Sequence, residues 1–505
     1  MALPTILSGN VASALGGGFD VDNSGRFNRA DSAFLSRSAS STSNRRTFTF
    51  SAWIKRSRIS NADATQMLFG THTDNSNRFE IGFHNANNLV IKEKLSGTTN
   101  IDFTTSRLLR DPTAWLHIVI AIDTTQSTES NRVKIYVNGS QETSFTDSNY
   151  PDQNYDTLVN VSGRTYTVAQ EGGNNYYFGG YMAEVCLIDG SQLAPTSFGE
   201  FNDDSPTIWQ PKDVSGLTFG TNGFHLNFQN SAELGTDVSG NSNTFTENNL
   251  VAGDQSTDTC TLHYPTWNPL TDFGDGTLSE GNTRFTGDSG DYTHCGTTFA
   301  ASKGKWYFEM QHAQTRSKVF MFCLHDINNS MYFKNNNIWF ATSPNSTGTT
   351  SFYLQLQNTN HATNRDIAIR KYVDQTQSDL ATGGGNLSAV LPVGILQIYL
   401  DLDNRRIHYY NNGTAIDQSN AASSTAGYGA IPAGTYSFAI TEARSPDSGD
   451  DGALLLDLNF GSPNANISIS SGNTDANGHG NFEYSPTVGG VNYYAMNSKN
   501  LAEFG

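Results

Sequence analysis

Short stretches in which apolar and polar residues alternate recur along almost the whole chain, separated by Gly, Asn, Asp and Ser. Typical examples in the first half are RTFTFSAWIKR, RFEIGFHN, NLVIKEK and NRVKIYVNG. A period of two is the signature of half-buried strands, and almost no segment keeps a helical period for three turns. The pattern therefore predicts an all-β protein.

Two stretches, NRVKIYVNGSQE and NRRIHYYNNGTA, share one pattern, in which an alternating strand ends at Asn-Gly. Asn138 and Gly139 suit the positive φ angles of a type I′ turn, so VKIYV is predicted to pair with ETSF, and residues 411–413 close a second turn. In WLHIVIAI nearly every residue is apolar, which indicates a central strand buried on both faces. Trp53, Trp115 and Trp306 lie within strand patterns and are predicted to be core residues.

The strand pattern appears twice along 505 residues, a length sufficient for two domains with separate cores. GFHLNF, near residue 225, is interpreted as the closing strand of the first sandwich. The predicted organisation is an N-terminal arm (1–17), a first β-sandwich (18–250), a linker (251–275), a second β-sandwich (276–470) and a C-terminal tail (471–505) that covers another surface.

Composition excludes several classes of protein. The net charge is −18 and the 30 basic residues are scattered, which argues against nucleic acid as a partner. The longest apolar runs are shorter than the roughly 20 residues that span a bilayer, and the start, MALPTILSGN, lacks the features of a secretory signal. The four cysteines form no Cys-x-x-Cys pair, so buried free thiols are expected instead of zinc ligands or disulfides.

Catalytic patterns are not found in the sequence. The nearest approaches to the Glu-x-Asp-x-Glu run of β-glucanases are Glu184 with Asp189, predicted on opposite faces of a strand, and Asp401 with Asp403, which lack a third partner. No Gly-x-Ser-x-Gly elbow in a strand-to-helix context and no His-Glu-x-x-His motif occurs. We therefore expect a protein that is not an enzyme and assign no catalytic residue.

A calcium site is one candidate for the stretch DVDNSGRFNRAD. Asp20, Asp22, Ser24 and Asp31 stand at positions 1, 3, 5 and 12 of the spacing found in EF-hand loops. Position 12 is Asp where that loop has Glu, and no amphipathic helices flank it. A plain polar turn is the alternative interpretation.

Carbohydrate binding is the remaining candidate chemistry, because sugars stack their C–H faces on aromatic rings and bond their hydroxyls to Asn and Asp. Loops with that composition are SNYPDQNYD, GGNNYYFGG and NNSMYFKNNNIW. In the alternative interpretation these aromatic residues pack against the sandwich ends or a neighbouring subunit. The candidate residues are Tyr150, Asp152, Asn154, Tyr155, Asn174, Tyr176, Tyr177, Tyr332 and Trp339.

The first half resembles LamG-like jelly rolls of the concanavalin A type through FTFSAWIKRS, AWLHIVIAIDTT, NRVKIYVNGS and GGYMAEVCLIDGSQLAPTSFGE. That last string, with LGTDVSGNSNTFTENN, is similar to LamG-bearing virion proteins of tailed bacteriophages, marine ones especially. The second half resembles a SPRY domain through GKWYFEM, LDLDNRRIHYYNNG, IPAGTYSFAI and LNFG, although MFCLHD replaces the usual glycine-rich segment. The resemblance implies two concanavalin A-like jelly-roll sandwiches in tandem, and LamG relatives often bind calcium at the sandwich rim.

On this resemblance we expect a non-enzymatic protein of the virion surface, assembled in the host cytoplasm as a tail fibre, tail-associated or head-decoration component. Its expected task is recognition of a host-surface glycan or protein. A purely architectural virion protein without a ligand and a glycan-degrading depolymerase stay open as alternatives. The expected partners are other virion proteins and the host surface, with a homo-oligomer, for instance a trimer, and no nucleic acid or membrane insertion.

Overall fold

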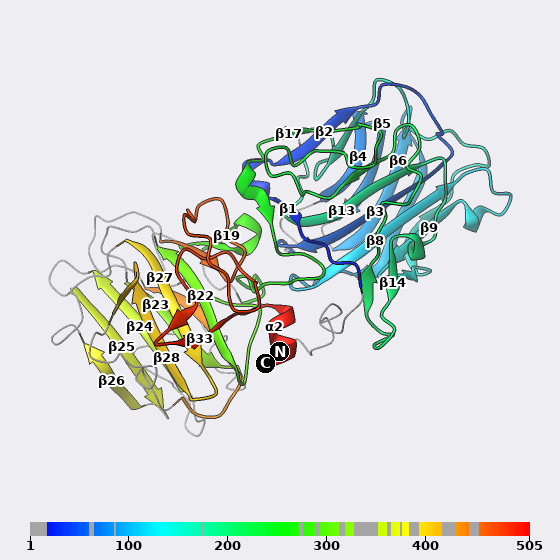
Figure 1. Cartoon of the computed structure of the whole chain (residues 1–505). Helices are drawn as coiled ribbons and strands as arrows, with labels where there is room; N and C mark the ends of the chain where they lie inside the picture. Colours follow the sequence, from blue (N-terminus) through cyan, green and yellow to red (C-terminus); the bar gives the residue numbers. More distant parts are fainter. Residues whose placement is uncertain are drawn as a thin grey trace. The chain divides into compact units, whose positions relative to one another are not determined.

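The computed structural model describes residues 18–59, 65–84, 87–173, 175–271, 276–287, 293–312, 319–327, 352–360, 365–373, 376–382, 393–416, 431–443 and 454–505. The described residues divide into two compact units, the first ending at residue 263 and the second comprising residues 264–505. Both are built almost entirely of antiparallel strands (Figure 1), as the alternating pattern predicts. The predicted N-terminal arm, 1–17, lies outside the described residues.

The first unit contains two large sheets. Sheet I has the order β10 (Ser140–Gln141), β9 (Val133–Val137), β8 (Trp115–Asp123), β3 (Thr47–Arg56), β13 (Gly180–Asp189), β1 (Ser24–Phe27) and β18 (Gln255–Ser256), with β16 (Phe224–Leu226) also paired to β13. Sheet II has the order β11 (Phe145–Asn149), β7 (Thr98–Leu108), β6 (Asn88–Leu95), β5 (Asn77–Phe83), β4 (Gln66–Asp74), β12 (Thr165–Val168), β2 (Phe34–Ser38) and β17 (Thr246–Asn248). Smaller elements are β14 (Gly199–Phe201) paired with β15 (Trp209–Pro211), and the 3-10 turns η3 (Arg29–Asp31), η5 (Glu129–Asn131), η6 (Pro195–Ser197) and η7 (Ala252–Asp254).

The second unit repeats the two-sheet plan. Sheet III has the order β19 (Thr277–Ser279), β20 (Arg284–Thr286), β31 (Leu455–Asn459), β22 (Lys305–His312), β27 (Gly394–Asp401), β28 (Arg406–Asn411) and β29 (Thr414–Ala415), with β34 (Tyr494–Ala495) paired parallel to β22. Sheet IV has the order β21 (Thr293–Gly296), β30 (Tyr436–Ala443), β23 (Val319–Asp326), β24 (Phe352–Asn360), β25 (Arg365–Val373) and β26 (Thr376–Thr382). The remaining elements are the hairpin of β32 (Thr487–Val488) and β33 (Val491–Asn492), the turn η8 (Glu280–Asn282) and helix α2 (Ser498–Phe504). No helix among the described residues has the length and apolar character needed to cross a membrane.

Each unit has an aromatic core between its sheets. In the first, Phe50 of β3 stacks on Phe69 of β4 with ring centroids 5.0 Å apart. In the second, Phe308 of β22 meets Phe438 of β30 at 4.5 Å. Aromatic contacts of this kind stabilise a sandwich beyond the apolar area that they bury.

Strand β8 is buried on both faces, as its continuous apolar run predicts. Ile118 and Ile120 face the core between the sheets, whereas Val119 faces outward into a second apolar cluster with Phe198. Trp53 and Trp115 are also buried, but they lie on the outer face of sheet I, in a cluster with Trp209. Residues 195–263 therefore cover this face, and sheet I is buried on both sides.

The two Asn-Gly stretches form the same turn. Asn138 and Gly139 have φ angles of 49° and 75°, and Asn412 and Gly413 have φ angles of 48° and 75°. Positive φ at both central positions defines a type I′ turn and confirms the prediction from the sequence. The partner strand of the first hairpin is Ser140–Gln141 and not the predicted ETSF, of which Glu142 donates its N–H to the Ile135 carbonyl at 2.8 Å and Phe145 begins β11 in sheet II.

The turn η3 lies between β1 of sheet I and β2 of sheet II. The structure also describes residues 251–271 of the predicted linker and the whole of the predicted tail. The boundary between the units falls inside the predicted linker. Residues up to His263 belong to the first unit, where Ser256 pairs with Ser24, and residues from Tyr264 belong to the second. The predicted tail is part of the second unit, since β34 joins sheet III.

Candidate functional site

The outer face of sheet II is the candidate site in the first unit. Phe79 and Ile81 of β5 point into the core, so Arg78 and Glu80 point outward by alternation. Across the sheet the register aligns Glu80 with Lys92, which in turn aligns with Asp102. The Lys92 ammonium lies 2.7 Å from the Asp102 carboxylate, and both side chains are about one-quarter exposed. A row of charged groups therefore crosses the outer face.

The loop between β12 and β13 folds onto this face. Its base is closed by hydrogen bonds from the Phe178 N–H to the Ala169 carbonyl and from the Ala169 N–H to the Leu68 carbonyl of β4, both 2.9 Å. A Cβ at Gly173 would lie 2.8 Å from the His72 ring, so the bare backbone is what allows this close approach.

Two carboxyl groups meet beneath the loop. Glu171 of the loop is in hydrogen-bonding contact with Glu80 of β5, and these residues are only 5 % and 3 % exposed. The pKa of Glu80 is raised to about 7, chiefly by burial and also by the contact with Glu171, although the charge of Arg78, which pairs with Glu80, lowers it. Two carboxylates in contact repel each other, so Glu80 is partly protonated near neutral pH. The two carboxyl groups are therefore hydrogen-bonded to each other beneath the loop, at the outer face of sheet II.

An aromatic pair lies on the same face, and one of its members, Tyr177, follows Glu171 closely in the chain. Tyr177 packs against Phe34 of β2, with ring centroids 6.0 Å apart, and Tyr176 is 40 % exposed. Phe34 points outward because its neighbour Leu35 is a core residue. We call Phe34, Tyr176 and Tyr177, with Glu80 and Glu171, the aromatic-carboxyl face.

Sequence reasoning singled out Tyr176 and Tyr177 but missed Glu80, Glu171 and Phe34. The outward position of Glu80 was accessible from the alternation in RFEIGF, in which Phe79 and Ile81 are the core residues. The proximity of Glu80 to Glu171 could not be predicted from the sequence, because 91 residues separate them and the docked loop brings them together.

The predicted loop SNYPDQNYD lies at the opposite end of the sandwich. The Asn154 N–H bonds to the Thr124 carbonyl, next to Asp123 at the end of β8, whereas the Tyr176 carbonyl accepts from Met67 near the start of β4. Asp152 and Asn154 are exposed. The structure therefore separates the predicted tyrosines into two places. Asn174, Tyr332 and Trp339 lie outside the described residues.

Tyr150 and Tyr155 hold the loop to the sandwich. The ring of Tyr150 lies edge-on to Phe103 at 4.7 Å, and the hydroxyl of Tyr155 donates to the Glu93 carboxyl at 3.3 Å. Glu93 is fully buried and also accepts from the Leu158 N–H at 2.7 Å. Burial raises the pKa of Glu93 to about 8, although both hydrogen bonds favour the charged form.

We predict that Glu93→Gln stabilises the first unit at alkaline pH. The folded state keeps the Glu93 proton up to about pH 8, whereas an unfolded Glu releases it near 4.5, so the stability from this group is present below 4.5 and is lost as pH rises to 8. Melting temperatures from pH 5 to 9 should decline less steeply in the variant. The exposed Glu129→Gln is the matched control, and parallel curves for wild type and Glu93→Gln would contradict the prediction.

The predicted calcium ligands do not form an EF-hand loop. Ser24 lies in β1, where its hydroxyl donates to the Asp258 carbonyl at 2.6 Å, and Asp31 lies in η3, where it accepts from the Asn28 amide at 2.7 Å. Asp20 and Asp22 are exposed before the strand. An extended strand in the middle of the spacing prevents the loop from curving around one ion. Among the described residues, no three His, Cys, Asp or Glu side chains form a group that could hold a metal ion.

The other acidic residues weighed in the sequence also have partners in the structure. Glu184, at a bulge of β13, lies 2.7 Å from the His225 ring, and Asp189 accepts from the Asn222 N–H and the Asn160 amide, both at 2.9 Å. Asp403 pairs with Lys305. The four cysteines are free thiols, and all but Cys260 are buried.

Comparison with known proteins places the fold of the first unit. Residues 28–192 match the family of the concanavalin A-like lectin/glucanases superfamily. A search of curated sequences found no match.

Similar solved structures include a heptameric pentraxin of Limulus polyphemus, with 15 % identity over 35 % of this chain and 80 % of that chain at a TM-score of 0.26. A protein of Bacteroides ovatus proposed to bind carbohydrate has 14 % identity over 46 % and 59 % of the chains at 0.29. The SPRY domain of human HERC1 has 10 % identity over 40 % and 99 % at 0.26. The family match over residues 28–192 agrees with a LamG-like jelly-roll fold of the concanavalin A type in the first unit.

Proposed function

We propose that this protein is a non-enzymatic recognition protein that binds carbohydrate on the aromatic-carboxyl face of its first unit. The observation that carries the proposal is the packing of Tyr177 on Phe34 at the outer face of sheet II, next in the chain to the exposed Tyr176 and on the face that also carries Lys92 and Asp102. Aromatic rings offer a stacking surface for the C–H face of a sugar, and the partly exposed side chains of Lys92 and Asp102 can bond to its hydroxyls. The match to the lectin/glucanase superfamily supports this choice of ligand.

The geometry of the Glu80–Glu171 carboxyl pair favours binding of a glycan over its cleavage. Retaining glycosidases hold their two carboxyl groups about 5 Å apart and inverting ones further, with the scissile bond between them. Glu80 and Glu171 are in hydrogen-bonding contact and almost fully buried, which leaves no room for a sugar between them.

The wider setting that we propose is the surface of a tailed-phage virion, where the protein would bind a host-surface glycan as a fibre, tail-associated or head-decoration component. The resemblance of the sequence to LamG-bearing virion proteins supports this setting. Other virion proteins and further copies of this chain are the partners that follow from it.

The test uses the full chain and bacterial surface polysaccharides, namely purified lipopolysaccharide and capsular polysaccharide, immobilised for biolayer interferometry. Tyr176→Ala and Tyr177→Ala should each weaken binding on the order of tenfold, since one stacked ring contributes about 1 kcal/mol. Asp152→Ala, an exposed change at the opposite end of the sandwich, is the matched control and should bind like wild type.

Two results would favour the alternatives. Release of new reducing ends from either polysaccharide would indicate a depolymerase. Absence of binding, or binding equal in wild type and both tyrosine variants, would contradict recognition at this face and favour an architectural role.

A further inference from the structure

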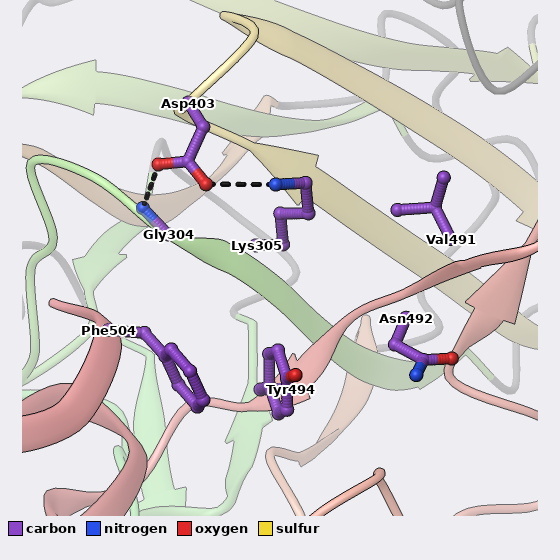
Figure 2. A pocket seen from close by; sticks show the side chains of 7 residues that line it. All are labelled: Gly304, Lys305, Asp403, Val491, Asn492, Tyr494 and Phe504. Carbon is purple, nitrogen blue, oxygen red and sulfur yellow. Dashed lines mark hydrogen bonds and ion pairs between the residues drawn. The ribbon is translucent and has the colours of Figure 1, made fainter.

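A pocket of about 370 Å³ lies in the second unit, far along the chain from the aromatic-carboxyl face. Figure 2 shows the seven residues that line it, and they come from four places in the fold: the start of β22, the turn after β27, the strands β33 and β34, and the end of helix α2. Its lining is Gly304, Lys305, Asp403, Val491, Asn492, Tyr494 and Phe504. A pocket of this size is typical of small-ligand sites.

One wall of the pocket is an ion pair. The Asp403 carboxylate accepts from the Gly304 N–H at 2.8 Å and from the Lys305 ammonium at 2.9 Å, as Figure 2 shows. Gly304 has a φ of +93°, and a Cβ there would lie 2.7 Å from the Trp306 ring, so glycine is what lets the backbone reach Asp403. The hydrogen bond with Asp403 raises the pKa of Lys305, which keeps the ammonium charged.

The opposite wall is aromatic. The rings of Tyr494 and Phe504 stack with centroids 4.1 Å apart and planes 23° from parallel. Phe504 is held there by helix α2, whose first turn is capped by the Asn497 side chain accepting from the Asn500 N–H at 2.8 Å. The C-terminal segment therefore supplies a fixed apolar surface that faces a charged pair.

Hydrogen-bonding capacity remains on the polar wall. Among the described residues, the Lys305 ammonium uses one of its three donors at hydrogen-bonding distance, on Asp403. The Asn492 side chain accepts from the Thr487 hydroxyl at 3.1 Å through its oxygen, which leaves its NH₂ group to donate. These donors and the remaining lone pairs of Asp403 surround the same space.

The charges in the pocket select for a neutral ligand. Lys305 disfavours a cation and Asp403 disfavours an anion, and their pairing leaves the wall close to neutral. A neutral ligand with several hydroxyl groups and one apolar face would satisfy both walls at once. Saccharides have this character, since their ring hydroxyls bond to polar groups while their C–H face stacks on aromatic rings.

We propose that this pocket is a second carbohydrate site, specific for an uncharged saccharide and independent of the site on the first unit. Tyr494 and Phe504 provide the stacking surface. Lys305, Asp403 and Asn492 bind the hydroxyls. The chain would then hold glycans through both of its units, and avidity would follow if one polysaccharide engaged both sites.

The test is saturation-transfer difference NMR on the full chain with cellotetraose, mannotetraose and N-acetylchitotetraose as neutral probes, and chitosan tetraose as a cationic one. At least one neutral tetraose should receive saturation from wild type. Asn492→Ala, an exposed change, should weaken that binding severalfold, and Tyr176→Ala in the first unit should leave this component in place. The two variants therefore report on the two proposed sites independently, even if one of the sites does not bind.

Lys305→Met provides the second arm, because it keeps the aliphatic stem and leaves Asp403 unbalanced. This variant should bind neutral tetraoses more weakly than wild type and chitosan tetraose more strongly. Thermal melts confirm that each variant is folded. The proposal is overturned if no neutral tetraose receives saturation at millimolar concentration, or if the signals are the same in wild type, Asn492→Ala and Lys305→Met.

Discussion

Asp258→Asn is expected to lower the free energy of unfolding of the first unit by about 3 to 5 kcal/mol, the usual cost of breaking a buried ion pair. The Asp258 carboxylate lies 2.7 Å from the Lys55 ammonium, and both side chains are at most 3 % exposed. It also accepts from the Trp115 indole N–H at 3.1 Å. Replacing the charge would leave the ammonium of Lys55 buried without its close carboxylate.

Urea unfolding followed by hydrogen exchange of peptides from β3 and β13 would assign the loss to the first unit. The double variant Lys55→Met with Asp258→Leu is the control, because an apolar pair of similar volume should recover much of the stability. A loss below 1 kcal/mol in Asp258→Asn would show that the pair is not essential to the fold.

Because of the Asp258 carboxylate, we also expect the stability of the first unit to fall in acid. Burial alone would raise the pKa of Asp258, but the charges of Lys55 and His263 overcome it and hold the pKa at about 2. The folded pKa is thus below the unfolded value of 3.8, so the stability from this group is present above pH 3.8 and is lost as pH falls towards 2.

Trp209→Ala is expected to cost about 3 to 5 kcal/mol, the range for truncating a buried tryptophan. Trp209 lies over the outer face of sheet I, where its indole N–H donates to His117 Nδ1 at 2.9 Å and its ring stacks on the His117 ring. Burial lowers the pKa of His117 to about 3, so the ring is neutral and its Nε2 proton donates to the Ser51 hydroxyl at 2.8 Å. The variant would leave both a cavity and a buried Nδ1 acceptor without its donor.

Trp209→Phe keeps one aromatic ring over the His117 ring, removes the N–H donor and leaves a smaller cavity than Trp209→Ala, so we expect a smaller cost of about 1 to 3 kcal/mol. Melting temperatures and limited proteolysis of residues 195–263 are measured on both variants. If Trp209→Ala is no less stable than Trp209→Phe, the aromatic ring at position 209 does not stabilise the packing of residues 195–263 on sheet I.

The aromatic-carboxyl face was only partly predictable from the sequence. Composition pointed to the loop that carries Tyr176 and Tyr177, because Asn, Gly and Tyr in a turn are typical of sugar sites. The same reasoning pointed equally to Tyr155, whose hydroxyl the structure places on the buried Glu93. Composition cannot distinguish a tyrosine that packs from one that is exposed, since that depends on what lies beneath the loop.

Local chemistry in the sequence determined the all-β class, the buried strand β8 and the turns at Gly139 and Gly413, because strand alternation and positive φ depend on neighbouring residues. Only the tertiary structure decided that Lys55 meets Asp258, 203 residues away, and that Glu171 meets Glu80. Each of these pairs brings distant parts of the chain together through sheet register and loop docking. The physical reason is that burial and charge act through space, so partners set by packing leave no periodic pattern along the chain.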